Sequence, residues 1–212
     1  MAKPVLWSST FTSGTMAHLA AAEAGADFDI RFLSLKKGEH RTPEYLAMNP
    51  KGQVPALDLG GGRVVTEFLA ILTYIARTHP AAGLMPSDPY AEARTLGWLG
   101  WISALMGSSI LPSFMPSRFT ADPAAEASVA ARGRERVAEA LAFAEAELAR
   151  GEVPGGEHGG LGLAEIGFFF LGMGVRFLKF EPADYPALGA HYARIAARPR
   201  IAAALGRERD IG

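Results

Sequence analysis

Two periodicities of apolar residues alternate over residues 1–78. Residues 4–8 form a short apolar run typical of a buried strand, and residues 28–32 alternate apolar and polar positions as a half-buried strand does. Between them, residues 13–24 carry apolar side chains at helical spacing, and Gly25 follows as a glycine often does after a helix. The pattern therefore predicts a strand, a helix and a second strand.

Further elements follow in the same segment. Residues 43–48 predict a short helix because proline suits the first helical position. The runs 54–59 and 63–65 flank three glycines and predict a β-hairpin, and residues 67–78 predict a helix capped by Thr66. The order is βαβ-ββα, which needs one parallel and one antiparallel pairing. We expect an α+β domain with one mixed four-stranded sheet and helices on both faces.

The pattern changes after residue 78. Residues 79–88 are rich in Pro, Gly and Ala and predict a linker. No strand pattern follows, so we expect an all-helical domain over residues 89–212 after the first domain at 1–78. The expected helices span residues 91–110, 124–150, 163–179 and 185–197, with a short helix from residue 200.

Composition and charge exclude several classes of protein. The chain has 212 residues, is 49% hydrophobic, and carries 21 Lys and Arg against 22 Asp and Glu. This balance argues against a disordered chain and against a nucleic-acid binder. The absence of cysteine excludes disulfides, thiolate metal sites and a cysteine nucleophile, and no metal is expected. The uncharged stretch 95–117 contains two prolines, which favours a buried helix over a membrane span. With no signal-peptide pattern, a cytoplasmic location is expected.

Val54 and Pro55 suggest a docking edge for a peptide. A proline that opens a strand removes one hydrogen-bond donor from the sheet, so the strand lies at an edge or the bond is cis. With a cis bond, the N–H and C=O of Val54 would face outward and pair with an extended peptide. The alternative is an ordinary turn.

Two other features suit the charged ends of such a ligand. The helix start at Thr66, Glu67 and Phe68 offers unpaired N–H groups to a carboxylate, and Glu67 suits an ammonium group. The basic residues between Lys36 and Arg41 suit a second carboxylate. The alternatives are a plain capped helix and a solvated loop. Together the features describe a ligand with an α-amino acid head, an extended backbone and a terminal carboxylate.

Three segments carry a family resemblance. Residues 38–57, from Gly38-Glu39-His40-Arg41 to Gln53-Val54-Pro55-Ala56-Leu57, resemble the glutathione transferases, especially phi-like and bacterial members. The stretch Thr66-Glu67-Phe68-Leu69-Ala70-Ile71-Leu72-Thr73-Tyr74 is similar to the same family, as is the region from Tyr185-Pro186-Ala187-Leu188 to Ala196-Ala197-Arg198-Pro199. Glutathione has the layout of the ligand described above.

The resemblance implies a fold and a function. It implies a thioredoxin-like N-terminal domain, an all-α C-terminal domain, a cytoplasmic homodimer, and a hydrophobic pocket between the domains. The expected activity is detoxifying transfer, in which glutathione, activated as a thiolate, attacks a hydrophobic electrophile. The alternatives are a glutathione-dependent lyase, isomerase or peroxidase, or a non-catalytic binding or interaction module on the same fold.

The resemblance also implies roles for single residues. Val54 would pair with the cysteinyl backbone of glutathione, and Pro55 is the expected cis-proline. The remaining glutathione contacts implied are Gln53 and Glu67 at the γ-glutamyl end, the backbone N–H of Phe68 near that end, and His40 and Arg41 at the glycyl carboxylate.

The sequence departs from the family at two places that matter for chemistry. Position 68 is Phe where the family usually has Ser, which removes a hydroxyl donor to the γ-glutamyl carboxylate. Bacterial beta-like members place a cysteine just before the first helix, where this chain has Ser13. A hydroxyl-type mechanism remains, with Ser13, Thr12 or Ser9 as the candidate that stabilises the thiolate.

Aromatic, aliphatic and methionine side chains are the candidates for the hydrophobic pocket. Such side chains also build ordinary cores, so a structural role is the alternative. The expected pocket residues are Trp7, Phe11, Trp101, Leu105, Met106 and Phe114.

Overall fold

The N-terminal part folds around a small mixed sheet. The structure, a computed structural model, describes residues 3–211. Its strands are β1 (Val5–Ser8), β2 (Asp29–Phe32), β3 (Ala56–Asp58) and β4 (Val64–Thr66), in the spatial order β2-β1-β3-β4. β1 pairs parallel with β2 and antiparallel with β3, and β3 pairs antiparallel with β4. The predicted mixed four-stranded sheet is confirmed.

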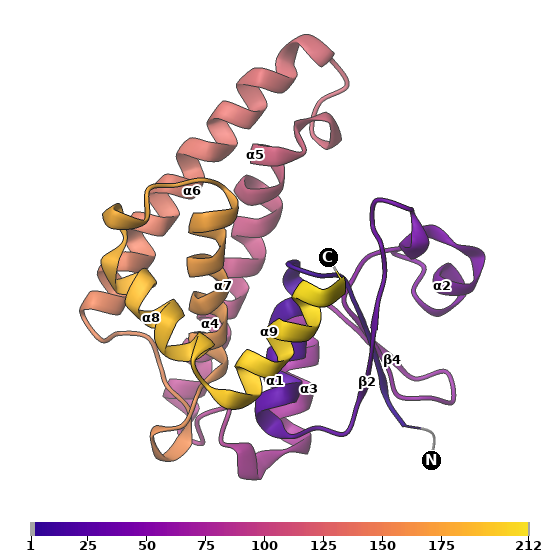
Figure 1. The fold of residues 1–212 in the computed structure, drawn as a ribbon, viewed down its shortest axis with the longest axis vertical. Coiled ribbons are helices and arrows are strands. Elements are labelled where there is room, and N and C mark those ends of the chain that lie inside the picture. The colour runs from indigo at the N-terminus through magenta and orange to yellow at the C-terminus, as the bar shows by residue number, and fades with distance from the viewer. Residues whose placement is uncertain (1–2, 212) are drawn as a thin grey trace.

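Helices cover both faces of this sheet, as Figure 1 shows. α1 (Ser13–Ala24) and α3 (Phe68–Thr78) pack together on the face that looks toward the helical part, and α2 (Pro43–Met48) lies on the opposite side. α1 is buried along most of its length because it sits between the sheet, α3 and the helices of the second part. Gly25 ends α1 with a left-handed φ of 65°, as predicted.

The start of α3 differs from the prediction. Thr66 is the last residue of β4 and pairs with Ala56 across the ladder, so it does not cap the helix. Glu67 takes the N-cap position with a φ of 69°, and its side chain makes no capping bond. The helix therefore follows the strand directly, and its first N–H groups lack partners from a cap.

The rest of the chain is helical in the part that the structure describes. The helices are α4 (Pro89–Leu105), α5 (Leu111–Phe114), α6 (Glu126–Ala149), α7 (Leu163–Phe177), α8 (Pro186–Ala196) and α9 (Pro199–Ile211). Across residues 3–211, none of the helices combines the length and apolarity that crossing a bilayer requires.

The predicted helix 91–110 is interrupted. α4 ends at Leu105, and Met106–Ile110 forms a π-helical turn that leads into α5. Pro112 lacks an N–H and cannot make the usual bond of an α-helix, while the N–H of Leu111 bonds the C=O of Met106 five residues earlier. The wider turn therefore joins two helices that the apolar pattern predicted as one.

α7 and α1 hold the two parts together. α7 is the most buried helix of the second part and packs against α1, α4 and α8. Phe168 and Phe169 of α7 are buried, as are Met16 and Leu19 of α1, and all belong to one continuous core. The sheet part and the helical part thus share one core.

Candidate functional site

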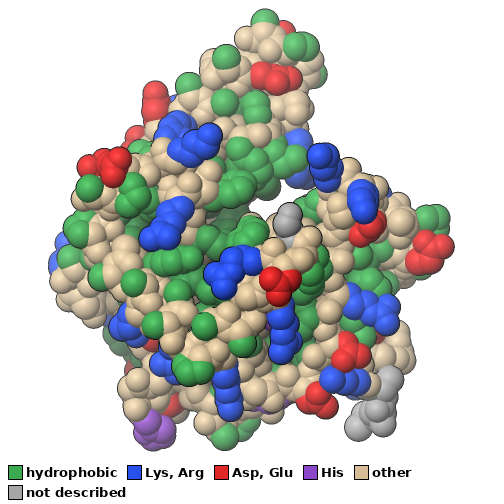
Figure 2. Space-filling model, in the orientation of Figure 1, with side chains coloured by type: hydrophobic (Ala, Val, Ile, Leu, Met, Phe, Trp, Pro, Cys, Tyr) green, Lys and Arg blue, Asp and Glu red, His purple; other side chains and the backbone are tan. Residues whose placement is uncertain are grey.

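A large cavity lies where the two parts meet. Its volume is about 990 Å³, and its lining comes from the loops around the sheet on one side and from α4 to α8 on the other. Figure 2 shows the hollow, with hydrophobic side chains in its depth and Lys or Arg side chains at its edge. The lining residues therefore offer both apolar and charged contacts.

The sheet side of the cavity contains every residue that the resemblance placed at glutathione. These residues, which all line the cavity, are His40, Arg41, Gln53, Val54, Pro55, Glu67 and Phe68. The Val54–Pro55 bond is cis, as predicted. Within residues 3–211, neither the N–H nor the C=O of Val54 makes a hydrogen bond. An edge of free backbone therefore borders the cavity.

Two side chains hold the loop that precedes Val54. The C=O of Gln53 accepts a hydrogen bond from Tyr45 Oη at 2.7 Å and another from Asn49 Nδ2 at 2.8 Å. Burial raises the pKa of Tyr45, so its hydroxyl stays a donor at neutral pH. These two hydrogen bonds hold the backbone of Gln53, the residue before Val54, at the edge of the cavity.

Lys51 faces the same end of the cavity and was not among the predicted site residues. Its Nζ donates to Glu67 Oε1 at 2.6 Å and to Thr66 Oγ1 at 2.9 Å. Both partners of the ion pair are at least half exposed, so water screens their attraction. The Glu67 carboxylate therefore already has one ammonium partner, that of Lys51, at this part of the cavity wall.

Phe68 contributes to the core rather than a polar contact. Its side chain is buried in the shared core, and it is the first residue of α3. The N–H groups of the first helical turn have no partner within the helix, so the backbone here still suits an anion.

Another part of the cavity wall is basic. Burial lowers the pKa of His40, and the positive charges of Arg41 and Arg118 lower it further, so His40 is neutral at neutral pH. The buried Nδ1 of His40 has no hydrogen-bond partner within residues 3–211. Arg118 follows α5 in the helical part and lines the same cavity as His40. The helical pattern of the sequence did not indicate that these two residues would lie near each other.

The three hydroxyl candidates differ in their surroundings. Ser9 is only 7% exposed and does not line the cavity. Thr12 lines it but serves as the N-cap of α1, because its Oγ1 donates to the Ser9 C=O at 2.8 Å and accepts from the Gly14 N–H at 3.2 Å. Ser13 lines the cavity at the first residue of α1, and its hydroxyl makes no hydrogen bond within the described chain. Thr10, which was not predicted, also lines the cavity.

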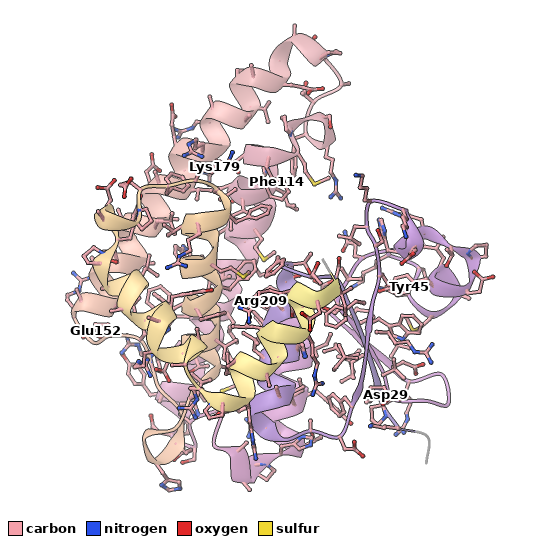
Figure 3. All side chains as sticks on the ribbon, viewed as in Figure 1. Asp29, Tyr45, Phe114, Glu152, Lys179 and Arg209 are labelled. Carbon is pink, nitrogen blue, oxygen red and sulfur yellow. The ribbon has the colours of Figure 1, made fainter. Side chains whose placement is uncertain are left out.

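Many lining residues on the helical side of the cavity are apolar. Among the residues expected from the sequence, Leu105, Met106 and Phe114 lie on this side, and Phe11 lines the cavity from the segment before α1. The ring of Phe114 meets that of Phe177 of α7 edge to face, with 5.7 Å between centroids. Figure 3 labels Phe114 in the helical part and Tyr45 in the sheet part of the molecule.

Two predicted pocket residues lie elsewhere. Trp7 alternates with Leu6 along β1, so it points to the other face of the sheet, where its ring meets Tyr45 of α2. Trp101 packs edge to face against Trp98 and Phe143, in an aromatic cluster between α4 and α6 that lies outside the cavity lining. The prediction of both as pocket residues was therefore wrong.

Within residues 3–211, no group of three or more His, Asp or Glu side chains is arranged to hold a metal ion.

Comparisons with known proteins show which sequences and structures this chain resembles. Residues 13–78 match the sequence family described as the glutathione S-transferase N-terminal domain. Maleylacetoacetate isomerase of Pseudomonas aeruginosa is 38% identical over 103 residues, which are 48% of this chain and 47% of that protein. The chain spans about half the length of the curated relatives it matches.

Solved structures match over nearly the whole chain. A glutathione transferase homolog from sulfitobacter with bound glutathione has a TM-score of 0.88 and 28% identity, covering 98% of this chain and 99% of that one. A sphingomonad glutathione S-transferase complexed with glutathione has a TM-score of 0.81 and 32% identity, covering 96% and 98% of the two chains. The cavity, the cis-proline and these matches lead to one conclusion: the chain belongs to the glutathione transferase family.

Proposed function

We propose that this protein binds glutathione in the cavity, activates it as a thiolate, and transfers it to a hydrophobic electrophile. The observation that carries the proposal is the free backbone of Val54, which borders the same cavity as the Ser13 hydroxyl and the apolar wall of Phe11 and Phe114. A tripeptide bound along this edge has its sulfur between the hydroxyl and the apolar wall. Residues 1–78 then bind glutathione, residues 89–212 bind the second substrate, and residues 79–88 link them.

Different residues of the cavity contact different parts of glutathione in this proposal. Val54 pairs with the cysteinyl backbone of glutathione through its N–H and C=O. At one end, Gln53 and Glu67 contact the γ-glutamyl group, whose carboxylate meets the first turn of α3 near Phe68. At the other end, Arg41 and the nearby His40 hold the glycyl carboxylate.

Ser13 is the residue that we propose to stabilise the thiolate. A free thiol has a pKa of about 8.5, and lowering it by two units requires about 2.7 kcal/mol of preference for the thiolate. A hydroxyl donating to the charged sulfur supplies about 1.5–3 kcal/mol, and the N-terminus of α1 adds to it. Thr12 already donates its proton to the Ser9 carbonyl, which leaves Ser13 better placed. The other hydroxyl in the cavity, that of Thr10, is the alternative.

The test compares single hydroxyl deletions. Ser13→Ala should raise the pKa of bound glutathione by about one unit and lower turnover with an aryl halide about tenfold. Glutathione affinity should stay close to that of the wild type, because the peptide contacts are unchanged. Thr10→Ala and Thr12→Ala are the matched variants, and thiolate absorbance titrated against pH is the measurement. Coincident curves for all four proteins would mean that no hydroxyl here activates the sulfur, which favours a binding module.

A second candidate is a glutathione-dependent isomerase. The relative from Pseudomonas aeruginosa is named maleylacetoacetate isomerase. Arg118 and Arg176 also line the cavity, and guanidinium groups suit a substrate that carries carboxylates. Product analysis separates the two activities, because a transferase consumes glutathione and an isomerase returns it unchanged.

A further inference from the structure

A carboxylate near the C-terminus is buried against the segment that leads into α1. Glu208 of α9 is 0% exposed. Its Oε2 accepts from the backbone N–H of Phe11 at 3.1 Å and from Thr15 Oγ1 at 2.8 Å, and its Oε1 lies 2.9 Å from His18 Nδ1. Both oxygens thus have partners, as burial of a charged group requires.

The backbone that Glu208 binds has an unusual conformation. Phe11 has a φ of 55°, in the left-handed region that side chains other than glycine rarely adopt. Such a residue keeps this conformation only when its surroundings impose it. The Phe11 N–H donates to Glu208, which lies far outside this segment in the chain. Thr12 and Ser13 follow directly, so the position of their hydroxyls depends on Phe11.

α9 lies alongside α1 and contacts it at both ends (Figure 1). Glu208 binds residues at the start of α1, near the cavity. At the far end, Arg198, which directly precedes α9, donates from Nε to Glu23 Oε1 at 3.1 Å, and Arg200 of α9 donates from Nη1 to the Glu23 C=O at 2.7 Å. These far contacts join α1 to the start of α9 without touching the segment at Phe11.

We propose that Glu208 is a positioning residue, which holds the segment from Ser9 to Ser13 so that the hydroxyl meets the glutathione sulfur. The catalytic consequence rests on the proposed function, whereas the effect on the segment itself does not. α9 is then part of the machinery of the site, although the structure places none of its residues in the cavity lining.

The first experiment measures the segment in the protein without ligand. Glu208→Ala should speed amide hydrogen exchange at residues 9–15 at least tenfold, because the Phe11 N–H loses its acceptor. Arg198→Ala is the matched control, since it weakens the α9–α1 contact at the far end and should speed exchange only near Glu23. Unchanged exchange at residues 9–15 in Glu208→Ala would overturn the proposal, whether or not glutathione binds.

The second experiment measures chemistry. Glu208→Ala should lower kcat by up to about tenfold, the loss expected for Ser13→Ala, and raise the pKa of bound glutathione, with its Kd within about threefold of the wild type, because displacing a catalytic group weakens its contact with the reacting atom. Glu208→Gln keeps a carbonyl oxygen for the Phe11 N–H and the Thr15 hydroxyl, so it should retain kcat within about threefold. Arg198→Ala should retain the wild-type kcat.

The outcomes separate the two proposals. Combining Glu208→Ala with Ser13→Ala should lower kcat no further than Ser13→Ala alone, because both changes remove the same interaction. Fully additive losses, or a Gln variant as impaired as the Ala variant, would overturn the positioning role. A wild type that binds no glutathione would refute the proposed function, and the exchange experiment would still decide the role of Glu208.

Discussion

At the level of single residues, Gly52 and Arg41 form a tightly fitted pair at the basic end of the cavity. Gly52 has a φ of 57°, and a Cβ at this position would lie 2.9 Å from Arg41 Nη1 and 3.0 Å from Leu46 Cδ2. The absence of a side chain therefore serves two purposes: it permits the left-handed turn before Val54 and leaves room for the guanidinium group.

Substitution of Gly52 should weaken glutathione binding by displacing Arg41. Gly52→Ala should lower the affinity about tenfold, since a hydrogen bond to a charged group is worth about 1.5–3 kcal/mol. Gly61→Ala is the matched control, because Gly61 also has a positive φ of 63° but open space around it. Both variants should lose about 1–2 kcal/mol of unfolding free energy. Calorimetry measures the affinities, and equal values for the two variants would argue against this role of Arg41.

At the level of elements, the start of α7 is held by one glutamate. Glu165 Oε2 accepts from the N–H of Gly162 at 2.9 Å, as the third helical residue does in a capping box, and Oε1 accepts from Arg194 of α8 at 2.6 Å. The Glu165 C=O accepts from His191 Nε2 at 2.8 Å. Burial lowers the pKa of His191, so a neutral ring with its proton on Nε2 fits this bond. These contacts fix α7, which carries part of the cavity wall, against α8.

Removal of the Glu165 side chain should destabilise this junction. Glu165→Ala should lower the free energy of unfolding by about 1–3 kcal/mol, because Gly162 and Arg194 lose their acceptor. Glu139→Ala on α6 is the control, since its carboxylate is exposed and 4.0 Å from Arg132, and it should leave stability nearly unchanged. Urea denaturation of the three proteins provides the measurement. Equal midpoints would show that the N-terminus of α7 does not depend on Glu165.

At the level of the whole molecule, the two parts act as one body around α1. This helix contacts the sheet strand β1, its neighbour α3, and both α7 and α9 of the second part. Because the cavity lies where these elements meet, neither part alone would form both of its walls. The apolar wall and the glutathione edge therefore depend on the same shared core.

We propose that the molecule is a homodimer, as the family resemblance implies. Light scattering at micromolar concentration should give a mass near twice the 22.5 kDa of one chain. A mass equal to that of one chain over this range would contradict the dimer.

Local sequence patterns determined much of this protein. The end of α1 at Gly25, the short helix α2, the cis bond before Pro55 and the bond from Glu165 to Gly162 all depend on residues close together in the chain. The sheet topology followed as well, because the order of strands and helices allows few arrangements. The segments that line the sheet side of the cavity were therefore visible in the sequence.

The tertiary structure alone decided which side chains share the cavity. Trp7 and Trp101 have the apolar character of pocket residues. The alternation along β1 directs Trp7 to the other face of the sheet, and Trp101 of α4 packs against Phe143 of α6. Arg118 beside His40, and Glu208 at the N–H of Phe11, join residues far apart in the chain. No spacing rule links residues 11 and 208, because that contact exists only once α9 packs against α1.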